Sequence, residues 1–316
     1  MTTPQALGGS WDSSYHAPVL ATEVVRILGG VGRVLDCTLG GGGHAAALLE
    51  AGSSVVGIDR DPEAIAAARQ RLARYEAAGR FHAYLVNYAD LDRIDALAGA
   101  RFDGILLDLG ISSHQIDDTR RGFSFREGAP LDMRMGDDTA RTAAELLAEE
   151  DERELARIFR EMADEPRAGR LAREIVRRRE RRPFATSDDL VAAIRGALGP
   201  RSGPSDFARI FQGVRIAVND ELAGLARALP ALRDRLSPGG TLAVIAYHSG
   251  EDRLVKHAMR EWSTACVCPP RQPVCTCGGR ALGALVTRKA ITASEDEIAR
   301  NPRARSARLR AWRSAE

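Results

Sequence analysis

The stretch Val34-Leu-Asp-Cys-Thr-Leu-Gly40-Gly-Gly-Gly-His44 is followed by an Ala/Leu-rich segment and by a second apolar run that ends at Gly57-Ile-Asp59. This order predicts a strand, a glycine turn, a helix and a second strand. The glycines leave the turn without side chains, so a ligand can approach the backbone, and the following helix directs its unpaired N–H groups toward that ligand. Asp59, at the end of the second strand, is placed to accept a hydrogen bond from a ribose diol.

Two cofactor classes fit this unit. Gly40-x-Gly42-x-x-Ala45 satisfies the dinucleotide fingerprint, but such a match is weak inside a run of glycines. Asp36 favours the other class, because a pyrophosphate at the end of the first strand would be repelled, whereas the ammonium and sulfonium of S-adenosyl-L-methionine would find a counter-charge. We therefore predict a methyl-donor site that includes Asp36. The alternative is a flexible turn with no ligand, in which Asp36 is only a cap.

Three later apolar runs also end in polar residues. They are Phe81–Val86, before Asn87 and Tyr88; Phe102–Asp108, before Leu109–Ser113; and Thr241–Tyr247, before His248–Arg253. Strands that alternate with helical segments predict an open, Rossmann-like α/β sheet, in which chemistry collects at the carboxyl ends of the strands. Tyr88 then either stacks on an adenine ring or packs in the core. His248 and Asp252 either lie near the cleft or belong to a region of helix capping and a salt bridge, with Ser249 and Glu251 as caps and Arg253 as the cation.

From about His114 to Arg209 the strand pattern is absent and helical patterns replace it. We predict an all-helical domain, residues 114–209, inserted into a sheet domain formed by residues 1–113 and 210–316. The insert contains the arginine-rich run Arg173–Arg182, which is either a solvated face or a surface for a phosphate backbone. After the insert, apolar residues from Val214 to Leu232 predict one long helix.

The chain has 316 residues, a hydrophobic fraction of 44% and a formal net charge of +2, values typical of a globular protein. It has no apolar run of transmembrane length, and Met1–Tyr15 lacks the layout of a signal peptide, so we expect a cytoplasmic protein. Four cysteines form two Cys-x-Cys pairs: Cys266, Cys268, Cys275 and Cys277. Such pairs can supply four thiolates to zinc, but they are tighter than the usual two-residue spacing, so we assign no metal site and keep zinc binding as the alternative.

The C-terminal segment Asn301–Arg313 has five arginines and one tryptophan. Arginines in such number suit RNA phosphates, and a tryptophan among them can stack on a base. We therefore expect this tail to contact RNA, with Trp312 as the stacking residue.

These motifs together resemble one family, the ribosomal RNA small-subunit methyltransferase H (MraW) family, which methylates N4 of a 16S rRNA cytidine. The motifs are His16-Ala-Pro-Val-Leu, Asp36-Cys-Thr-Leu-Gly-Gly-Gly-Gly-His, Gly57-Ile-Asp-Arg-Asp-Pro62, Asp108-Leu-Gly-Ile-Ser-Ser, Arg121-Gly-Phe-Ser-Phe, Leu131-Asp-Met-Arg-Met, Val218-Asn-Asp-Glu-Leu, His248-Ser-x-Glu-Asp-Arg and Asn301-Pro-Arg-Ala-Arg-Ser. The resemblance covers nearly the whole chain. Ala246-Tyr-His-Ser-Gly250 stands where the family usually has Ser-Phe-His-Ser-Leu, and Ser205-Asp-Phe-Ala-Arg209 replaces the usual His-Pro-Ala-Thr-Arg.

The resemblance implies a class I methyltransferase sheet that binds S-adenosyl-L-methionine, an inserted helical RNA-recognition domain, and 16S rRNA of the small ribosomal subunit as the partner. It implies donor binding by Gly42, Gly43, His44, Asp59, Tyr88, Asp108 and Gln115. Tyr88 replaces the phenylalanine usual in the family, which keeps a ring for stacking.

The chemistry of cytosine suggests the catalytic groups. Its exocyclic amine is a poor nucleophile, so a site must hold it in line with the sulfonium methyl and accept its N–H groups. We expect Asp108, Ser112 and Ser113 to provide these acceptors, with His248 as a further candidate, and the base to leave its stack. The alternatives are methylation of a small-molecule or protein amine, and a non-catalytic RNA-binding assembly factor with a vestigial donor site.

Overall fold

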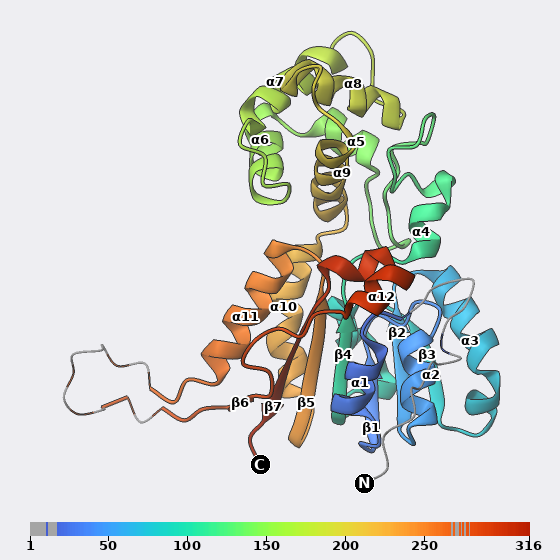
Figure 1. Cartoon of the computed structure of the whole chain (residues 1–316), viewed down its shortest axis with the longest axis vertical. Helices are drawn as coiled ribbons and strands as arrows, with labels where there is room; N and C mark the ends of the chain where they lie inside the picture. The colour runs from blue at the N-terminus through green and yellow to red at the C-terminus, as the bar shows by residue number, and fades with distance from the viewer. Residues whose placement is uncertain are drawn as a thin grey trace. The chain divides into compact units, whose positions relative to one another are not determined.

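The computed structural model describes residues 11, 18–266, 268, 272, 274, 276, 277 and 279–316. The chain divides into two compact units, one formed by Met1–Gly110 with Gly224–Glu316 and the other by Ile111–Ala223 (Figure 1). The second unit thus begins three residues before the expected insert and ends fourteen residues after it, since 114 and 209 were the expected limits.

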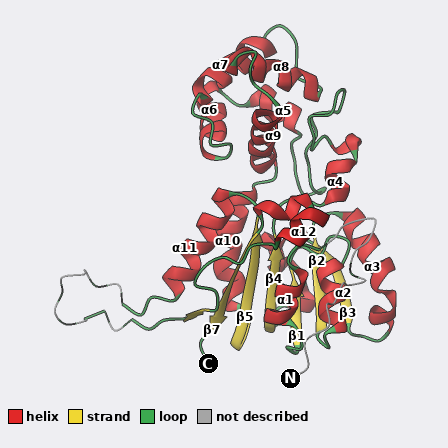
Figure 2. Cartoon of the chain, viewed as in Figure 1, coloured by secondary structure: helices red, strands yellow, loops and turns green. Residues whose placement is uncertain are grey.

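The first unit is built on a seven-stranded sheet of order β3-β2-β1-β4-β5-β7-β6 in the described part of the chain (Figure 2). The strands are β1 (Arg33–Asp36), β2 (Ser54–Asp59), β3 (Phe81–Leu85), β4 (Phe102–Asp108), β5 (Leu236–Ala246), β6 (Gly283–Leu285) and β7 (Arg308–Ser314). Strands β1 to β5 are parallel, and β7 runs antiparallel to β5 and β6. The strand order reverses between β1 and β4, which is where open α/β sheets bind their ligands. The predicted Rossmann-like fold is confirmed.

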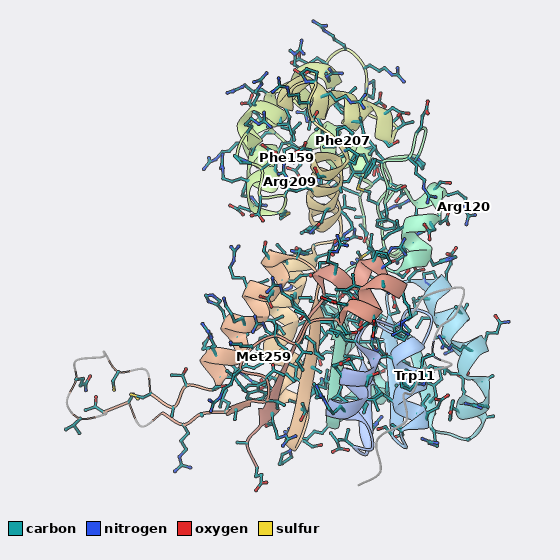
Figure 3. All side chains as sticks on the ribbon, viewed as in Figure 1. Trp11, Arg120, Phe159, Phe207, Arg209 and Met259 are labelled. Carbon is teal, nitrogen blue, oxygen red and sulfur yellow. The ribbon has the colours of Figure 1, made fainter. Side chains whose placement is uncertain are left out.

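Each face of this sheet is covered by helices. One face packs against α1 (Ala21–Leu28), α2 (Gly43–Glu50) and α3 (Pro62–Ala77) through residues such as Val34 and Leu106. The other face packs against α10 (Glu221–Asp234) and α11 (Ser249–Trp262), and Met259 of α11 lies in that core (Figure 3). Neighbouring residues of the central strand β1 point into opposite cores, so Val34 and Leu35 are both fully buried.

The C-terminal segment contradicts the expectation that Trp312 stacks on RNA. Its last part is β7, which pairs with β5, and Trp312 has an exposed fraction of 0%. The Trp312 ring packs edge-on against Trp262 at 5.3 Å between centroids, and its Nε1 donates to Ser263 Oγ at 3.0 Å. Stacking of Trp312 on RNA is therefore wrong. The segment alternates charged and apolar residues in the strand period, a pattern that its arginine content obscured.

The second unit is helical. Its helices are α4 (Ser113–Asp117), α5 (Ala143–Glu149), α6 (Glu152–Glu161), α7 (Ala168–Arg179), α8 (Ser187–Leu198) and α9 (Pro204–Val218). Buried side chains from α6, α7, α8 and α9 make one core, which contains Phe159 and Phe207 (Figure 3). The apolar stripes of α6 and α7, at Leu155, Ile158, Phe159, Leu171 and Ile175, are buried as their spacing predicts.

The long helix expected from Val214 to Leu232 is broken. Asn219 ends α9, and Asp220 has a φ of 52°, a left-handed conformation that no helix interior adopts. The buried amide of Asn219 holds the break, because its Nδ2 donates to Met133 O at 2.7 Å and its Oδ1 accepts from Met135 N at 2.9 Å. The inserted unit therefore includes the whole of α9 instead of ending within it at Arg209.

Candidate active site

The glycine turn between β1 and α2 has the conformation that its sequence predicts. Gly40 and Gly42 have φ values of 51° and 74°, so both occupy the left-handed region that glycine adopts without strain. A Cβ on Gly42 would lie 3.0 Å from Leu72, and one on Gly43 would lie 3.1 Å from Pro18, whereas one on Gly40 would meet nothing within 4 Å. Gly42 and Gly43 thus let α2 pack closely, and only Gly40 borders open space.

Asp59 fastens this turn to β2. Its Oδ2 accepts from Gly40 N at 2.8 Å and its Oδ1 accepts from Asp61 N at 3.0 Å. Burial raises the pKa of Asp59 to about 6, although these amide hydrogen bonds oppose the shift. A carboxylate has about four acceptor positions, so Asp59 keeps capacity for a ribose hydroxyl.

Buried Asp36 and His44 form a cluster with the half-buried Asp108 at the carboxyl ends of β1 and β4. Asp36 has an exposed fraction of 1%, and its Oδ1 accepts from Thr38 N at 3.2 Å. Its Oδ2 is buried and has no hydrogen-bond partner among the described residues. Burial raises the pKa of Asp36 to about 7, and the carboxylates of Asp108 and Asp59 add to that shift while His44 opposes it. A buried unpaired carboxylate oxygen is costly, which is the state expected of a group awaiting a cationic partner.

His44 lies between the two carboxylates. Its Nε2 is 3.3 Å from Asp108 Oδ2 without the alignment of a hydrogen bond, and its Nδ1 has no partner in the described part of the chain. Burial lowers the pKa of His44, but the carboxylates of Asp108 and Asp36 outweigh burial and leave the pKa raised. The cluster therefore holds polar atoms that only a further molecule can satisfy.

Asp108 is held by two residues that the sequence did not single out. Tyr247 Oη donates to Asp108 Oδ1 at 2.8 Å, and Asp108 N donates to Thr38 Oγ1 at 2.6 Å. Burial and the Asp108 carboxylate raise the pKa of Tyr247 well above its usual range, so its hydroxyl stays a donor. The available signal was that Tyr247 ends an apolar run with a hydroxyl where the family usually has phenylalanine.

His248 and Asp252 have local partners. His248 caps α11, since its Nδ1 accepts from Gly250 N at 3.2 Å and its Nε2 lies 3.2 Å from Glu251 Oε1. Asp252 Oδ1 accepts from Arg310 Nε at 2.6 Å, which ties α11 to β7. The capping and salt-bridge alternative describes these contacts, with His248 as the cap in place of Ser249 and Arg310 as the cation in place of Arg253.

The remaining predicted site residues are Ser112, Ser113, Gln115 and Tyr88. In the second unit, Ser112 Oγ accepts from Gln115 N at 3.1 Å and Gln115 Oε1 accepts from Ser112 N at 3.0 Å, a reciprocal cap at the start of α4. Ser113 is the first residue of α4, and its side chain is outside the described part of the structure. In the first unit, half-buried Tyr88 follows β3 and packs against the sheet core. Roles of these residues in binding or catalysis stay predictions.

A model of the MraW methylase family matches residues 13–315. The chain belongs to this family. It is 66% identical over 315 residues, with 100% of both chains covered, to "Ribosomal RNA small subunit methyltransferase H" of Gemmatimonas aurantiaca. It is 50% identical over 302 residues to the protein of the same name from Anaeromyxobacter dehalogenans, covering 94% of this chain and 96% of that protein.

Solved structures with similar architecture include an rRNA methylase from Streptococcus thermophilus, with 11% identity, a TM-score of 0.41 and 94% of each chain covered. Another is the N-methyltransferase NodS from Bradyrhizobium japonicum in complex with S-adenosyl-L-homocysteine, with 11% identity, a TM-score of 0.43, and 94% of this chain and 86% of that chain covered.

Family membership confirms that the chain is a methyltransferase. Its methyl donor is S-adenosyl-L-methionine, the cofactor predicted from Asp36 and the glycine turn. None of the described helices has the length and apolar character needed to cross a bilayer.

Proposed function

We propose that the chain transfers a methyl group from S-adenosyl-L-methionine to N4 of a specific cytidine in 16S rRNA of the small ribosomal subunit. The observation that carries the proposal is the cluster of Asp36, His44 and half-buried Asp108 at the switch point of the sheet, in a chain that aligns over nearly its whole length with relatives named as methyltransferases of small-subunit ribosomal RNA.

The residues present fit the donor. Asp36 Oδ2 and His44 Nδ1 are buried without partners among the described residues, and a ligand with positive charge and N–H donors would satisfy Asp36. Asp59 would bind the ribose, and Tyr88 the adenine ring. Gly42, Gly43, His44, Asp108 and Gln115 would complete the set, in keeping with the family resemblance. When bound, the donor supplies the activated methyl group.

Asp108 is proposed to accept an N–H of the cytosine amine, which makes the nitrogen lone pair available, and to take the proton that the amine loses after transfer. Tyr247 and Thr38 fix this carboxylate and its backbone, so it needs little reorganisation when substrate arrives. Ser112 and Ser113 are proposed as further acceptors, and His248 as a secondary candidate because Glu251 and the α11 backbone already engage it.

A ribose role for Asp59 predicts that Asp59→Ala weakens donor binding by roughly 1.5 to 3 kcal/mol, the range of a hydrogen bond to a charged group. Isothermal titration calorimetry measures this effect. Asp103→Ala is a matched control, because Asp103 Oδ2 accepts from Arg33 N at 2.8 Å at the opposite end of the sheet. Both variants lose carboxylate-to-amide bonds, two at Asp59 and one at Asp103, and some thermal stability, but only Asp59→Ala is expected to lose donor affinity. Equal donor affinities in the two folded variants would remove Asp59 from the site.

The helical unit is proposed to recognise RNA. On α7, Arg177 Nε and Arg178 Nε both donate to Glu174, at 3.1 and 2.6 Å, so two cations share one anion and the face stays positive. Arg181, beyond the end of α7, is exposed. Arg177 and Arg178 keep 57% and 37% of their side chains exposed, so phosphates can approach them while they stay paired with the half-buried Glu174.

Replacing Arg177, Arg178 and Arg181 with glutamine is expected to lower the slope of log affinity against log salt by about 2, since each phosphate contact contributes about 0.7 with single-stranded RNA. Filter binding at several salt concentrations measures the slope. A triple glutamine variant of Arg69, Arg74 and Arg93, exposed arginines of the sheet unit, makes the same charge change and should keep the slope. Identical slopes for both variants and the unchanged chain would make the α7 face a solvated one.

One experiment tests the proposed reaction. The chain is incubated with methyl-labelled donor and small subunits that lack the modification, and the labelled nucleoside is mapped. The expected result is label at N4 of one cytidine. Label on another nucleoside, on protein or on a small molecule would replace the substrate, and donor binding without any transfer would favour a non-catalytic assembly factor.

A further inference from the structure

The described residues of the segment that connects α11 with β6 form no apolar core. None of its described residues between positions 263 and 282 is buried, and Val274 has an exposed fraction of 71%. Yet three cysteine sulfurs of this segment, from Cys266, Cys268 and Cys277, all lie within 4.8 Å of one another. Burial of apolar side chains among the described residues does not explain this convergence, and the contacts that accompany it are hydrogen bonds to and between the sulfurs.

The sulfur separations exclude a disulfide between the two outer cysteines and match a metal site. Cys266 Sγ and Cys277 Sγ are 3.8 Å apart, whereas a disulfide bond is about 2.05 Å long. Four sulfurs arranged tetrahedrally around zinc at about 2.3 Å lie roughly 3.8 Å from one another. The observed separation is that of an S–H···S hydrogen bond between two thiols, and it is also that of two thiolate ligands of one ion.

Backbone amides surround the sulfurs in the manner of a thiolate site. Cys268 N donates to Cys266 Sγ at 3.4 Å, which folds the Cys-x-Cys backbone around the first sulfur and explains how so tight a pair converges. The amides of Thr276 and Cys277 are directed at Cys268 Sγ. Such hydrogen bonds stabilise thiolates and orient metal ligands.

Gly279 permits the close approach of the chain around Cys277 to the chain around Ala265 and Cys266. A Cβ at this position would lie 2.6 Å from Ala265 O and 3.4 Å from Cys277 Sγ, so any larger residue would push the cysteine pairs apart.

We propose that Cys266, Cys268 and Cys277 bind a structural zinc ion, the alternative that the sequence left open. Thiolates are soft ligands that select zinc among the abundant divalent ions. Zinc binding supplies folding free energy where a small segment has no core, so the ion would staple the connection between α11 and β6. Cys275, the fourth cysteine of the sequence pattern, lies outside the described residues, and the proposal rests on the other three.

The test uses the full chain, expressed with zinc in the medium and purified without chelator. Elemental analysis is expected to give about one zinc ion per chain, the stoichiometry of a single thiolate site. Cys266→Ser and Cys277→Ser should each remove most of it. Cys37→Ser is the matched control: it also removes one cysteine, but from β1's buried end, and should keep the zinc.

A second measurement avoids dependence on whether the variants fold. Zinc is removed from the unchanged chain by a chelator under reducing conditions, and Co²⁺ is then titrated in. The expected result is the intense visible absorption of tetrahedral cobalt–thiolate coordination, lost again on adding zinc. Zinc below about a tenth of an ion per chain together with no cobalt–thiolate bands would overturn the proposal, as would iron in place of zinc or equal zinc loss in the Cys37→Ser control. None of these outcomes bears on methyl transfer.

Discussion

Asp108→Asn is expected to lower the single-turnover rate of methylation by about 10² to 10³-fold at saturating donor and RNA, the cost of losing one preorganised electrostatic group. The carboxylate accepts from Tyr247 Oη and faces His44 Nε2, so an amide in its place must turn an NH2 toward one of them. The asparagine also lacks the negative charge with which Asp108 would accept the proton released by the cytosine amine. The fold should persist, because Asp108 N still donates to Thr38 Oγ1.

Tyr247→Phe distinguishes the effect of the orientation of the Asp108 carboxylate from the effect of its charge. It keeps the Asp108 carboxylate but removes the hydroxyl that orients it, so we expect a loss of only about tenfold in rate and little change in donor affinity. Ser113→Ala is expected to lower the rate with unchanged dissociation constants. Near-normal methylation rates for both Asp108→Asn and Ser113→Ala would contradict the catalytic roles of Asp108 and Ser113. His248 would then be the leading catalytic candidate, because Asp252 is already paired with Arg310.

Much of the sheet is predictable from local sequence. Strands β1, β2 and β4 are mainly apolar runs that end in aspartate. The glycine turn after β1 predicts both the helix that follows it and a ligand at its backbone. Their side chains are buried on both faces, so the pattern is strong and needs no knowledge of distant residues. The same logic places Asp36, Asp59 and Asp108 at the carboxyl edge of the sheet.

The features that local sequence missed depend on partners far along the chain. The break at Asn219 is fixed by hydrogen bonds to Met135 and Met133, 84 and 86 residues earlier. The bond from Tyr247 to Asp108 spans 139 residues. Trp312 is buried because β7 inserts beside β5, and nothing within the segment itself indicates that neighbour. Periodicity indicates which face of an element is buried, but not what a polar group meets there.

Donor affinity is expected to rise with pH through about 7, the raised pKa of Asp36. A cationic donor binds the ionised carboxylate, so below that pKa binding must displace a proton and loses up to tenfold in affinity per pH unit, about 1.4 kcal/mol. The other charged groups act in the same direction. Asp59, with a pKa near 6, loses its charge on further acidification, and His44, beside Asp108 and Glu297, gains a positive charge that repels the donor.

Asp36→Asn separates the contribution of Asp36 from those of its neighbours, and calorimetry from pH 5.5 to 8.5 together with thermal melts measures it. At pH 8 the variant should bind donor about 10 to 100-fold more weakly and lose the change in affinity near pH 7, while the effects of Asp59 and His44 remain.

The folding stability of Asp36→Asn without donor should increase, not decrease. A buried acid whose folded pKa is raised destabilises the fold once pH exceeds its unfolded pKa, by on the order of a few kcal/mol here, and a neutral amide removes that penalty while still accepting from Thr38 N. The expected result is therefore that Asp36→Asn binds the donor more weakly than the unchanged protein but has a melting temperature at least as high. If the two proteins show the same pH dependence of donor affinity, or if Asp36→Asn has the lower melting temperature at pH 8, Asp36 maintains the turn and does not bind the donor.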